Sequence, residues 1–189
     1  MKLILAQGNP GDKYTSTRHN TGFLLIDQLA DKLGAKFTER SKFSSLIAET
    51  SISGEKVLLV KPTTYYNETG RSARQLVDFY KLDAKDDVLV IHDDIALPFG
   101  SVRVRLKGSS AGNNGIKSLN AHLGEDYSRI RVGVSNELRT RLKDDVSFVL
   151  APFTKPEIIK LNETIFPQVS ELIEDFCRGS LTSVSHNLL

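Results

Sequence analysis

The sequence predicts one α/β domain spanning residues 1–189, with a twisted, mixed and largely parallel central sheet and helices on both faces. Short apolar runs of strand length alternate along the chain with longer segments whose apolar residues recur at helical spacing. One run, Val88 to Ile91, is continuously apolar and bounded by charged residues, which is typical of a strand buried on both faces. The length of 189 residues and the hydrophobic content of 40% suit a single core.

The first third of the chain is expected to form a strand, a helix and a hairpin. The strand, Leu3 to Ala6, ends at the loop Gly8-Asn9-Pro10-Gly11 and so delivers Asn9 to that loop. A helix that begins near residues 20–22 and stops at Gly34 is indicated by apolar residues at helical spacing: Ile26, Leu29, Ala30 and Leu33. Two strands, Ser45 to Ile52 and Lys56 to Lys61, flank a short connection that contains Gly54, which predicts a hairpin.

The middle of the chain carries a second helix and two further strands. The helix starts shortly after Asn67, because apolar residues repeat at helical spacing as far as Tyr80. The buried strand Asp87 to His92 follows and leaves His92 and Asp93 at its end. From Val102 to Arg105 valine alternates with arginine, which predicts a strand with one apolar and one basic face.

The last third begins with a loop rich in Gly, Ser and Asn, from Lys107 to Gly115. A short helix over residues 116–123 and a strand from Ser128 to Val134 follow it, and Val146 to Leu150 is either a short strand or part of the next element. The final helix begins at Thr154-Lys155-Pro156-Glu157, which has the spacing of a capping box with proline in the first turn. A kink is expected at Pro167.

Basic residues concentrate in one stretch of an almost neutral chain. The formal charge is +2, yet between Ser101 and Lys143 nine basic residues stand against three acidic ones. Such a cluster is the electrostatic footprint that a phosphate-rich ligand needs. A solvated basic face without a ligand explains it equally well.

Cysteine content and hydropathy favour the cytoplasm. The lone cysteine, Cys177, excludes an intrachain disulfide and a cysteine-based zinc site, which fits a reducing compartment. The N-terminal apolar stretch is too short for a signal sequence, and no apolar run approaches the ~18 residues of a membrane span. We therefore expect a cytoplasmic protein without membrane contact.

Polar side chains collect in the loops that follow the predicted strands, which is where open α/β sheets bind ligands. These loops contain Asn9, His19, Tyr65-Tyr66-Asn67, His92-Asp93 and Asn113-Asn114. Whether the loops converge is left open by the sequence.

Each of the four histidines is a candidate acid or base, because imidazole titrates near neutral pH. Ordinary roles suit three of them: His92 ends a buried strand, His122 lies on a helix surface and His186 lies in the C-terminal tail. His19 precedes the first helix, where its imidazole is free to face a cleft. Helix capping and core packing are the alternatives for His19.

Several signatures of other chemistries are absent. No G-x-S-x-G, C-x-x-C or H-E-x-x-H segment occurs, which disfavours serine hydrolases and zinc enzymes. The segment Gly112 to Ser118 fails the Walker pattern because its lysine does not directly follow the glycine, and Gly8 to Gly11 lacks G-x-G-x-x-G. We expect neither a metal nor a cofactor.

Four motifs follow one another along the chain: Gly8-Asn9-Pro10-Gly11-x-x-Tyr14-x-x-Thr17-Arg18-His19-Asn20-x-Gly22, Lys61-Pro62-Thr63-Thr64-Tyr65-Tyr66-Asn67-x-x-Gly70, His92-Asp93-Asp94 and Gly112-Asn113-Asn114-Gly115. In order and spacing they resemble the signatures of the bacterial peptidyl-tRNA hydrolase family. The resemblance extends from the first residues to the basic strand near Arg131, and the total length agrees too.

The resemblance implies an enzyme that hydrolyses the ester between tRNA and a peptide or N-blocked aminoacyl group, which recycles tRNA during translation. His19 would be the general base that takes a proton from water, and Asp93 would orient its imidazole, with no covalent intermediate. An ester has a better leaving group than an amide, so this chemistry can proceed without a metal. The implied partner is peptidyl-tRNA, held at its acceptor end and phosphates by a monomeric protein.

The same resemblance assigns roles to further polar residues. Asn9 would be a catalytic residue that helps separate N-blocked substrates from free aminoacyl-tRNA. The side-chain amides of Asn67 and Asn114 would bind the peptide backbone. Tyr14 and Tyr65 would line the path to the tRNA end, with core packing as the alternative. The basic residues that would hold tRNA phosphate are Arg103, Arg105 and Arg131.

One position departs from the family pattern, and two rival functions stand beside the main one. Tyr66 occupies a place where the family usually has methionine. The tyrosine adds a hydroxyl beside His19, which bears on the shape of the pocket more than on the reaction.

The first rival function is a catalytically silent RNA-binding relative of the same fold. The joint presence of five motif residues argues against it: Asn9, His19, Asn67, Asp93 and Asn114. The second is a general small-ester hydrolase, which the basic strand face disfavours.

Overall fold

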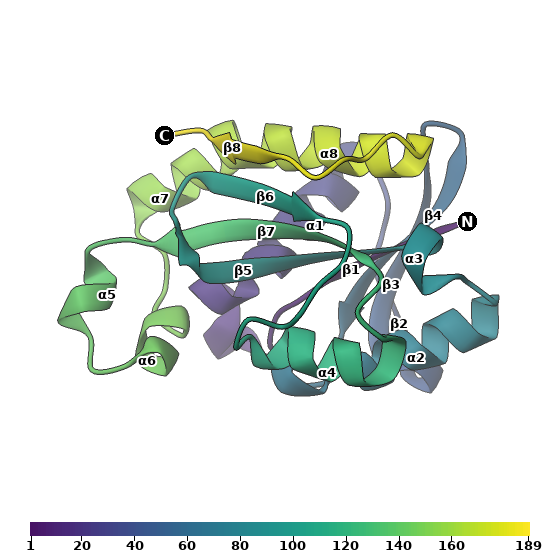
Figure 1. The fold of residues 1–189 in the computed structure, drawn as a ribbon, viewed down its shortest axis with the longest axis horizontal. Helices are drawn as coiled ribbons and strands as arrows, with labels where there is room; N and C mark the ends of the chain where they lie inside the picture. The colour runs from purple at the N-terminus through teal and green to yellow at the C-terminus, as the bar shows by residue number, and fades with distance from the viewer.

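The computed structural model describes residues 1–189 and contains an eight-stranded sheet in the order β2-β3-β4-β1-β5-β7-β6-β8 (Figure 1). The four central strands are mutually parallel: β4 (Glu55–Pro62), β1 (Lys2–Ala6), β5 (Val88–Pro98) and β7 (Ser128–Ser135). The strands that flank them pair in antiparallel fashion: β3 (Ser45–Ile52) and β2 (Thr38–Arg40) on one side, β6 (Ser101–Arg105) and β8 (Ser185–Asn187) on the other. The predicted α/β fold with a mixed, largely parallel sheet is confirmed.

Helices cover both faces of the sheet (Figure 1). On one face, α1 (Thr21–Leu33) and α8 (Phe166–Arg178) pack against a core that includes Ile4, Leu89 and Ile91. On the other face, α2 (Thr69–Tyr80) and α4 (Asn114–Leu123) cover a core that includes Leu3 and Val90. Successive residues of a strand point to opposite faces, which is why neighbours such as Leu3 and Ile4 belong to different layers. No helix combines the length and the apolar character needed to cross a membrane.

Most predicted elements are present with close boundaries. The helix α1 ends immediately before Gly34, and α7 (Lys155–Lys160) begins with the predicted capping box between Thr154 and Glu157. In the helix where a kink was expected at Pro167, a π-helical segment, Leu161–Ile165, precedes the proline and joins α7 to α8. Proline lacks the N–H that an α-helical turn needs there, and a wider turn accommodates the loss.

Short elements account for most differences from the sequence-based expectation. Val146 to Leu150 is neither a strand nor part of the next helix, because Asp144 caps a separate helix, α6 (Asp145–Val149), which follows α5 (Leu138–Arg141). His186, expected in a tail, lies in the edge strand β8. The remaining short helices are α3 (Ala84–Asp87) and four 3₁₀ turns, η1 (Asp12–Tyr14), η2 (Arg18–Asn20), η3 (Ser41–Phe43) and η4 (Tyr66–Glu68).

The strand β5 is longer than its apolar run predicts. Its pairing with β1 ends at Ala6 opposite Ile91, but its pairing with β7 continues through Asp94 opposite Gly133. Asp93 was expected at the end of the strand, in a loop. It lies instead within β5, on the part that extends beyond β1, so one side of it is open to the loop that precedes α1.

A buried ion pair ties that loop to the start of α7. The Arg18 side chain is fully buried, and its Nη2 lies 2.8 and 2.9 Å from the two carboxylate oxygens of Glu157. Its Nη1 donates to the backbone oxygens of Ala151 and Pro152. A buried charge is costly unless it is paired, so this network fixes the position of the residue that precedes His19.

Replacing Glu157 with glutamine is expected to lower the free energy of unfolding by about 2–3 kcal/mol near neutral pH, because the Arg18 guanidinium loses its counter-charge. Burial alone raises the pKa of Glu157, but hydrogen bonds from Thr154 and the charge of Arg18 outweigh it and hold the pKa below its usual value. The contribution of the carboxylate is therefore present above the usual glutamate pKa and is lost as pH falls through the lowered one. Urea denaturation at several pH values should show the gap to wild type shrinking toward acid.

The matched control is Glu163→Gln, an exposed glutamate in the π-helical segment, which should change the unfolding free energy by less than about 0.5 kcal/mol. Equal unfolding free energies of Glu157→Gln and wild type near neutral pH would contradict the role given to the ion pair.

Candidate active site

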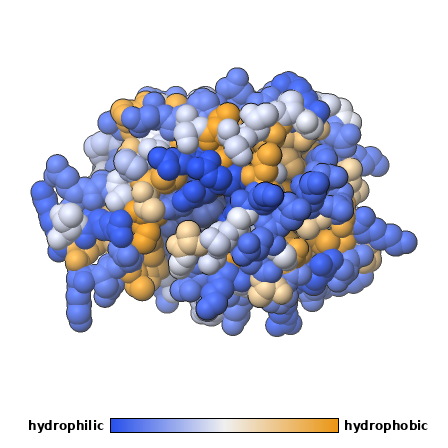
Figure 2. Space-filling model, viewed as in Figure 1, coloured by the Kyte–Doolittle hydropathy of each residue, from blue (hydrophilic) through white to orange (hydrophobic).

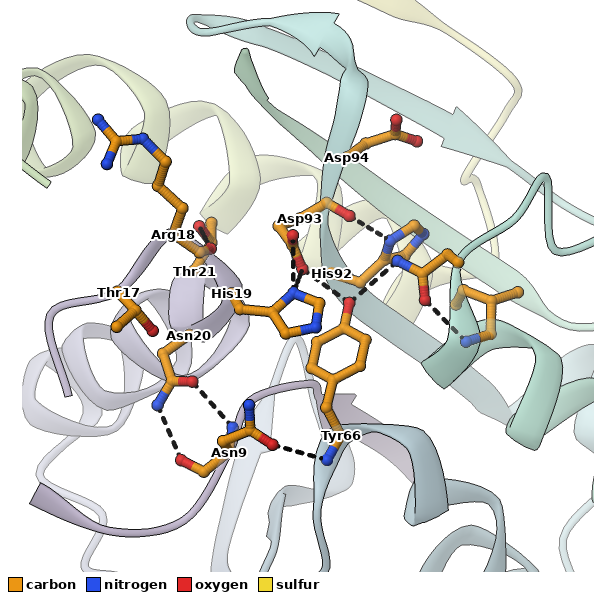
Figure 3. A network of polar contacts seen from close by, with 12 residues as sticks. Asn9, Thr17, Arg18, His19, Asn20, Thr21, Tyr66, His92, Asp93 and Asp94 are labelled. Carbon is orange, nitrogen blue, oxygen red and sulfur yellow. Dashed lines mark hydrogen bonds and ion pairs between the residues drawn. The ribbon is translucent and has the colours of Figure 1, made fainter. Parts of the chain in front are cut away.

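The side chains of His19 and Asp93 meet where β5 passes the end of β1 (Figure 3). His19 comes from η2, immediately before α1, and its Nδ1 lies 3.0 and 2.9 Å from the Oδ1 and Oδ2 of Asp93. The Asp93 side chain is 2% exposed, whereas the His19 side chain is 20% exposed. A buried carboxylate therefore holds an imidazole whose outer edge reaches solvent.

A close approach of α1 to the sheet brings these two groups together. Gly22 lies in the first turn of α1, where a Cβ would come within 2.5 Å of the Gln7 carbonyl oxygen and 2.7 Å of the Ile91 carbonyl oxygen. Any larger residue would force the helix away from the ends of β1 and β5. Glycine lets the turn rest on the strand backbones, which places His19 beside Asp93.

The electrostatics of the pair determine which imidazole nitrogen is basic. Burial alone raises the pKa of Asp93, but the charge of His19 and hydrogen bonds from His19 and Tyr66 outweigh it, and the pKa lies below its usual value. An ionised carboxylate only accepts hydrogen bonds, so Nδ1 of His19 carries the proton and donates it. In the neutral form of the ring Nε2 presents a lone pair, and Nε2 makes no hydrogen bond within the protein. This arrangement can take a proton from a water molecule at Nε2.

The neighbouring His92 does not share this environment. It is 3% exposed, and its Nδ1 lies 2.7 Å from the backbone oxygen of Asp93. Burial lowers the pKa of His92, so the neutral ring donates to that oxygen. His92 is thus a buried residue that braces the backbone of β5.

Tyr66 forms the third member of the site. Its ring stacks on that of His19 with a centroid separation of 3.5 Å and an interplanar angle of 16°. Its hydroxyl donates to Oδ1 of Asp93 at 2.7 Å and accepts from Nδ2 of Asn113 at 3.1 Å. Asn113 also caps α4 by accepting from the Ile116 backbone N–H at 3.0 Å. An asparagine directly before a helix is a signal that could have singled out Asn113, but no sequence signal shows that Tyr66 reaches Asp93.

A paired hydrogen bond fixes the loop that carries Asn9. The Asn9 backbone N–H donates to the Asn20 side-chain oxygen at 2.8 Å, and the Asn20 Nδ2 donates to the Asn9 backbone oxygen at 2.9 Å. The Asn9 Oδ1 accepts from the Tyr66 backbone N–H at 2.9 Å. The Asn9 Nδ2 makes no hydrogen bond within the protein, and Figure 3 shows it on the His19 side of the loop. Asn20, which the sequence analysis assigned no role, therefore orients Asn9.

The other polar candidates lie around this centre without touching it. Asn67, in η4, and Asn114, the first residue of α4, are exposed, and their side chains make no hydrogen bond within the protein. Tyr65 is 56% exposed, and Tyr14 is half-buried with the Lys13 ammonium 4.8 Å from its ring centroid. No hydrogen bond or ring stacking joins any of these four side chains to His19 or Asp93.

Four arginines occupy one face of β6 and β7, where the surface in Figure 2 is strongly hydrophilic. Arg103 pairs across the strands with Arg131, and Arg105 with Arg129. Arg129, which the sequence analysis gave no role, is buried and donates to the backbone oxygens of Gly108 and Ser109. The Nε of Arg131 donates to Oδ2 of Asp94 at 2.7 Å. Arg103 has no acidic or hydrogen-bonding partner, so the face carries uncompensated positive charge.

Comparisons with known proteins bear on the family to which this chain belongs. The family model described as peptidyl-tRNA hydrolase matches residues 3–188. A peptidyl-tRNA hydrolase of Desulfitobacterium hafniense is 50% identical over 166 residues, which cover 87% of this chain and 87% of that protein. A peptidyl-tRNA hydrolase of Fusobacterium nucleatum is 46% identical over 165 residues, which cover 87% of this chain and 84% of that protein.

The comparison of three-dimensional structures points to the same family. The crystal structure of peptidyl-tRNA hydrolase from Acinetobacter baumannii matches with a TM-score of 0.84 and 29% identity, covering 95% of this chain and 89% of that chain. Because the family model spans nearly the whole sequence and the relatives agree in both sequence and fold, this chain belongs to the peptidyl-tRNA hydrolase family.

Proposed function

We propose that this chain hydrolyses the ester between tRNA and a peptide or N-blocked aminoacyl group, with His19 as the general base and Asp93 as its orienting carboxylate. The observation that carries the proposal is the contact of 2.9 Å between His19 Nδ1 and Asp93 Oδ2, which leaves Nε2 free of hydrogen bonds on a side chain that is partly exposed. Membership of the peptidyl-tRNA hydrolase family supports the choice of substrate. A silent RNA-binding relative has no need for a buried carboxylate that fixes one imidazole tautomer.

In the proposed reaction, Nε2 of His19 takes a proton from a water molecule while the water oxygen attacks the ester carbonyl. Asp93 stabilises the imidazolium that forms, and the free Nδ2 of Asn9 is a donor for the oxyanion of the tetrahedral intermediate. The C–O bond to the terminal ribose then breaks, and the imidazolium returns its proton to the ribose oxygen. The products are a peptide with a free carboxyl group and a tRNA with a free hydroxyl group.

The free amides around the site suit a substrate whose peptide sequence varies. The unpaired side chains of Asn67 and Asn114 can donate to and accept from a peptide backbone without reading its side chains. The exposed ring of Tyr65, and that of Tyr14 beside the same loops, offer faces on which the terminal bases of tRNA can stack.

The arginine face of β6 and β7 is the proposed phosphate site, formed by Arg103, Arg105 and Arg131. Like charges directly opposite one another on neighbouring strands are destabilising, and a bound polyanion removes that cost. Asp94 engages only the Nε of Arg131, so the two terminal nitrogens of the guanidinium remain for a phosphate. We further propose that residues 1–189 act as one monomeric domain in the cytoplasm, without a cofactor.

A His19→Asn variant is expected to lower kcat for an N-acetylaminoacyl-tRNA by roughly 10²–10⁴-fold, since asparagine cannot take a proton from water. An Asp93→Asn variant should also lose activity, because an amide can stabilise the wrong imidazole tautomer. Single-turnover hydrolysis of the labelled substrate measures both variants.

The matched control is His122→Asn, which changes an exposed histidine on α4 whose Nδ1 contacts the Ser118 backbone oxygen. It should turn over at the wild-type rate. Wild-type turnover by His19→Asn would remove His19 from the mechanism.

Neutralising one phosphate-binding arginine is expected to weaken tRNA binding and to reduce its salt dependence. For Arg103→Gln, the slope of log K against log salt concentration should fall in magnitude by about 0.7–0.9. Filter binding of tRNA over a salt series measures the slope. Arg178→Gln, an exposed position on α8 paired with Glu174, should keep the wild-type slope, and an unchanged slope for Arg103→Gln would favour a general small-ester hydrolase.

A further inference from the structure

We propose that Tyr66 is a positioning residue whose hydroxyl fixes the Asp93 carboxylate and keeps His19 available as a base at lower pH. The inference rests on the proposed function and concerns how the surroundings of His19 set its orientation and the pH range in which it acts as a base. Three features of the site carry it: the hydrogen bond to Asp93, the stacking on His19 and the fixed position of the tyrosine ring.

The hydroxyl binds a carboxylate oxygen that the imidazole also contacts. Tyr66 donates to Oδ1 of Asp93 at 2.7 Å, and Oδ1 is also 3.0 Å from Nδ1 of His19. With two donors on the carboxylate, rotation about its Cβ–Cγ bond breaks a hydrogen bond. The imidazole that faces it is therefore held in one orientation.

The ring of Tyr66 is itself fixed in place. One face stacks on His19, and a Cβ at Gly115 would come within 2.4 Å of Tyr66 Cε1, so the ring edge lies directly against the first turn of α4. Asn113 donates to the hydroxyl, and its own side-chain oxygen is bound to the Ile116 N–H. A chain of hydrogen bonds thus runs from the N-terminus of α4 through Tyr66 to Asp93.

The direction of the effect follows from charge. A hydroxyl that donates to Asp93 withdraws electron density from the carboxylate, so Asp93 stabilises the imidazolium less than an unshared carboxylate does. The neutral base then persists to lower pH. The hydroxyl keeps its own proton, because burial and the charge of Asp93 raise the pKa of Tyr66 well above its usual value. No proton leaves Tyr66 in this proposal.

The test is Tyr66→Phe, which keeps the ring and removes the hydroxyl. On N-acetylaminoacyl-tRNA, the acid limb of the kcat/KM profile should move up by roughly half a pH unit. The plateau of kcat should fall about three- to tenfold, with KM within about twofold of wild type, because orientation of the base matters in the transition state. Tyr80→Phe, a half-buried tyrosine on α2 without a hydrogen-bonded hydroxyl, is the matched control and should leave all three quantities unchanged.

A second variant and a second readout separate tuning from folding. Asn113→Ser keeps a capping side chain for α4 but is too short to reach the Tyr66 hydroxyl, so it should move the acid limb in the same direction by a smaller amount. NMR titration of the His19 ring, which needs no turnover, should show the same displacement of its midpoint in each variant.

These readouts also distinguish the two proposals. Displaced NMR midpoints in a protein that does not cleave the substrate would leave the tuning by Tyr66 intact and overturn the proposed function. Acid limbs and NMR midpoints identical to wild type in both variants would overturn the role of Tyr66, including the case in which Tyr66→Phe only loses stability.

Discussion

The site depends on one buried carboxylate that must remain charged. Asp93 is 2% exposed, and ionisation at such a position is tolerated only with donors close by. His19 and Tyr66 are those donors, at 2.9 and 2.7 Å. The need of the carboxylate for hydrogen bonds therefore selects the rotamers of two side chains from different loops. The extension of β5 beyond β1 and the glycine at position 22 create the space in which the three groups meet.

The groups around Asp93 are anchored through two parts of the fold, the start of α7 and the start of α4. The loop of His19 is tied to α7 through the Arg18–Glu157 ion pair, and Asn9 is tied to the same loop through Asn20. Tyr66 is held by Asn113 at the start of α4. Because two separate helices contribute, the protein itself holds the imidazole in one orientation, which would lower the entropic cost of reaching the reactive geometry in the proposed reaction.

Patterns that repeat along the chain were sufficient to predict most of the fold, whereas contacts set by tertiary packing were not. Periodicity located α1, α2 and β7, and the motif resemblance named His19 and Asp93. The edge strands β2 and β8 have mostly exposed residues and gave no apolar signal. The length of β5 is set by its neighbour β7, and the bond from Tyr66 to Asp93 joins segments 27 residues apart, so neither has a local signature. The basic face was predicted, but not the burial of Arg129 or the pairing of Arg131 with Asp94.

The pairing of Arg131 with Asp94 lowers the net positive charge of the proposed phosphate site near His19 and Asp93. In the proposed reaction the imidazole gains a positive charge in the transition state, and unpaired arginines near it would oppose that charge. Arg131 lies opposite His92 on the adjacent strand, one residue from Asp93, and Asp94 neutralises part of its charge. Successive residues of a strand point to opposite faces, so the Arg131 side chain and the Asp93 carboxylate lie on opposite faces of the sheet. In the proposed reaction, a tRNA phosphate bound to the outer nitrogens of Arg131 would neutralise more of the charge that opposes the imidazolium, and a small ester without phosphates would not.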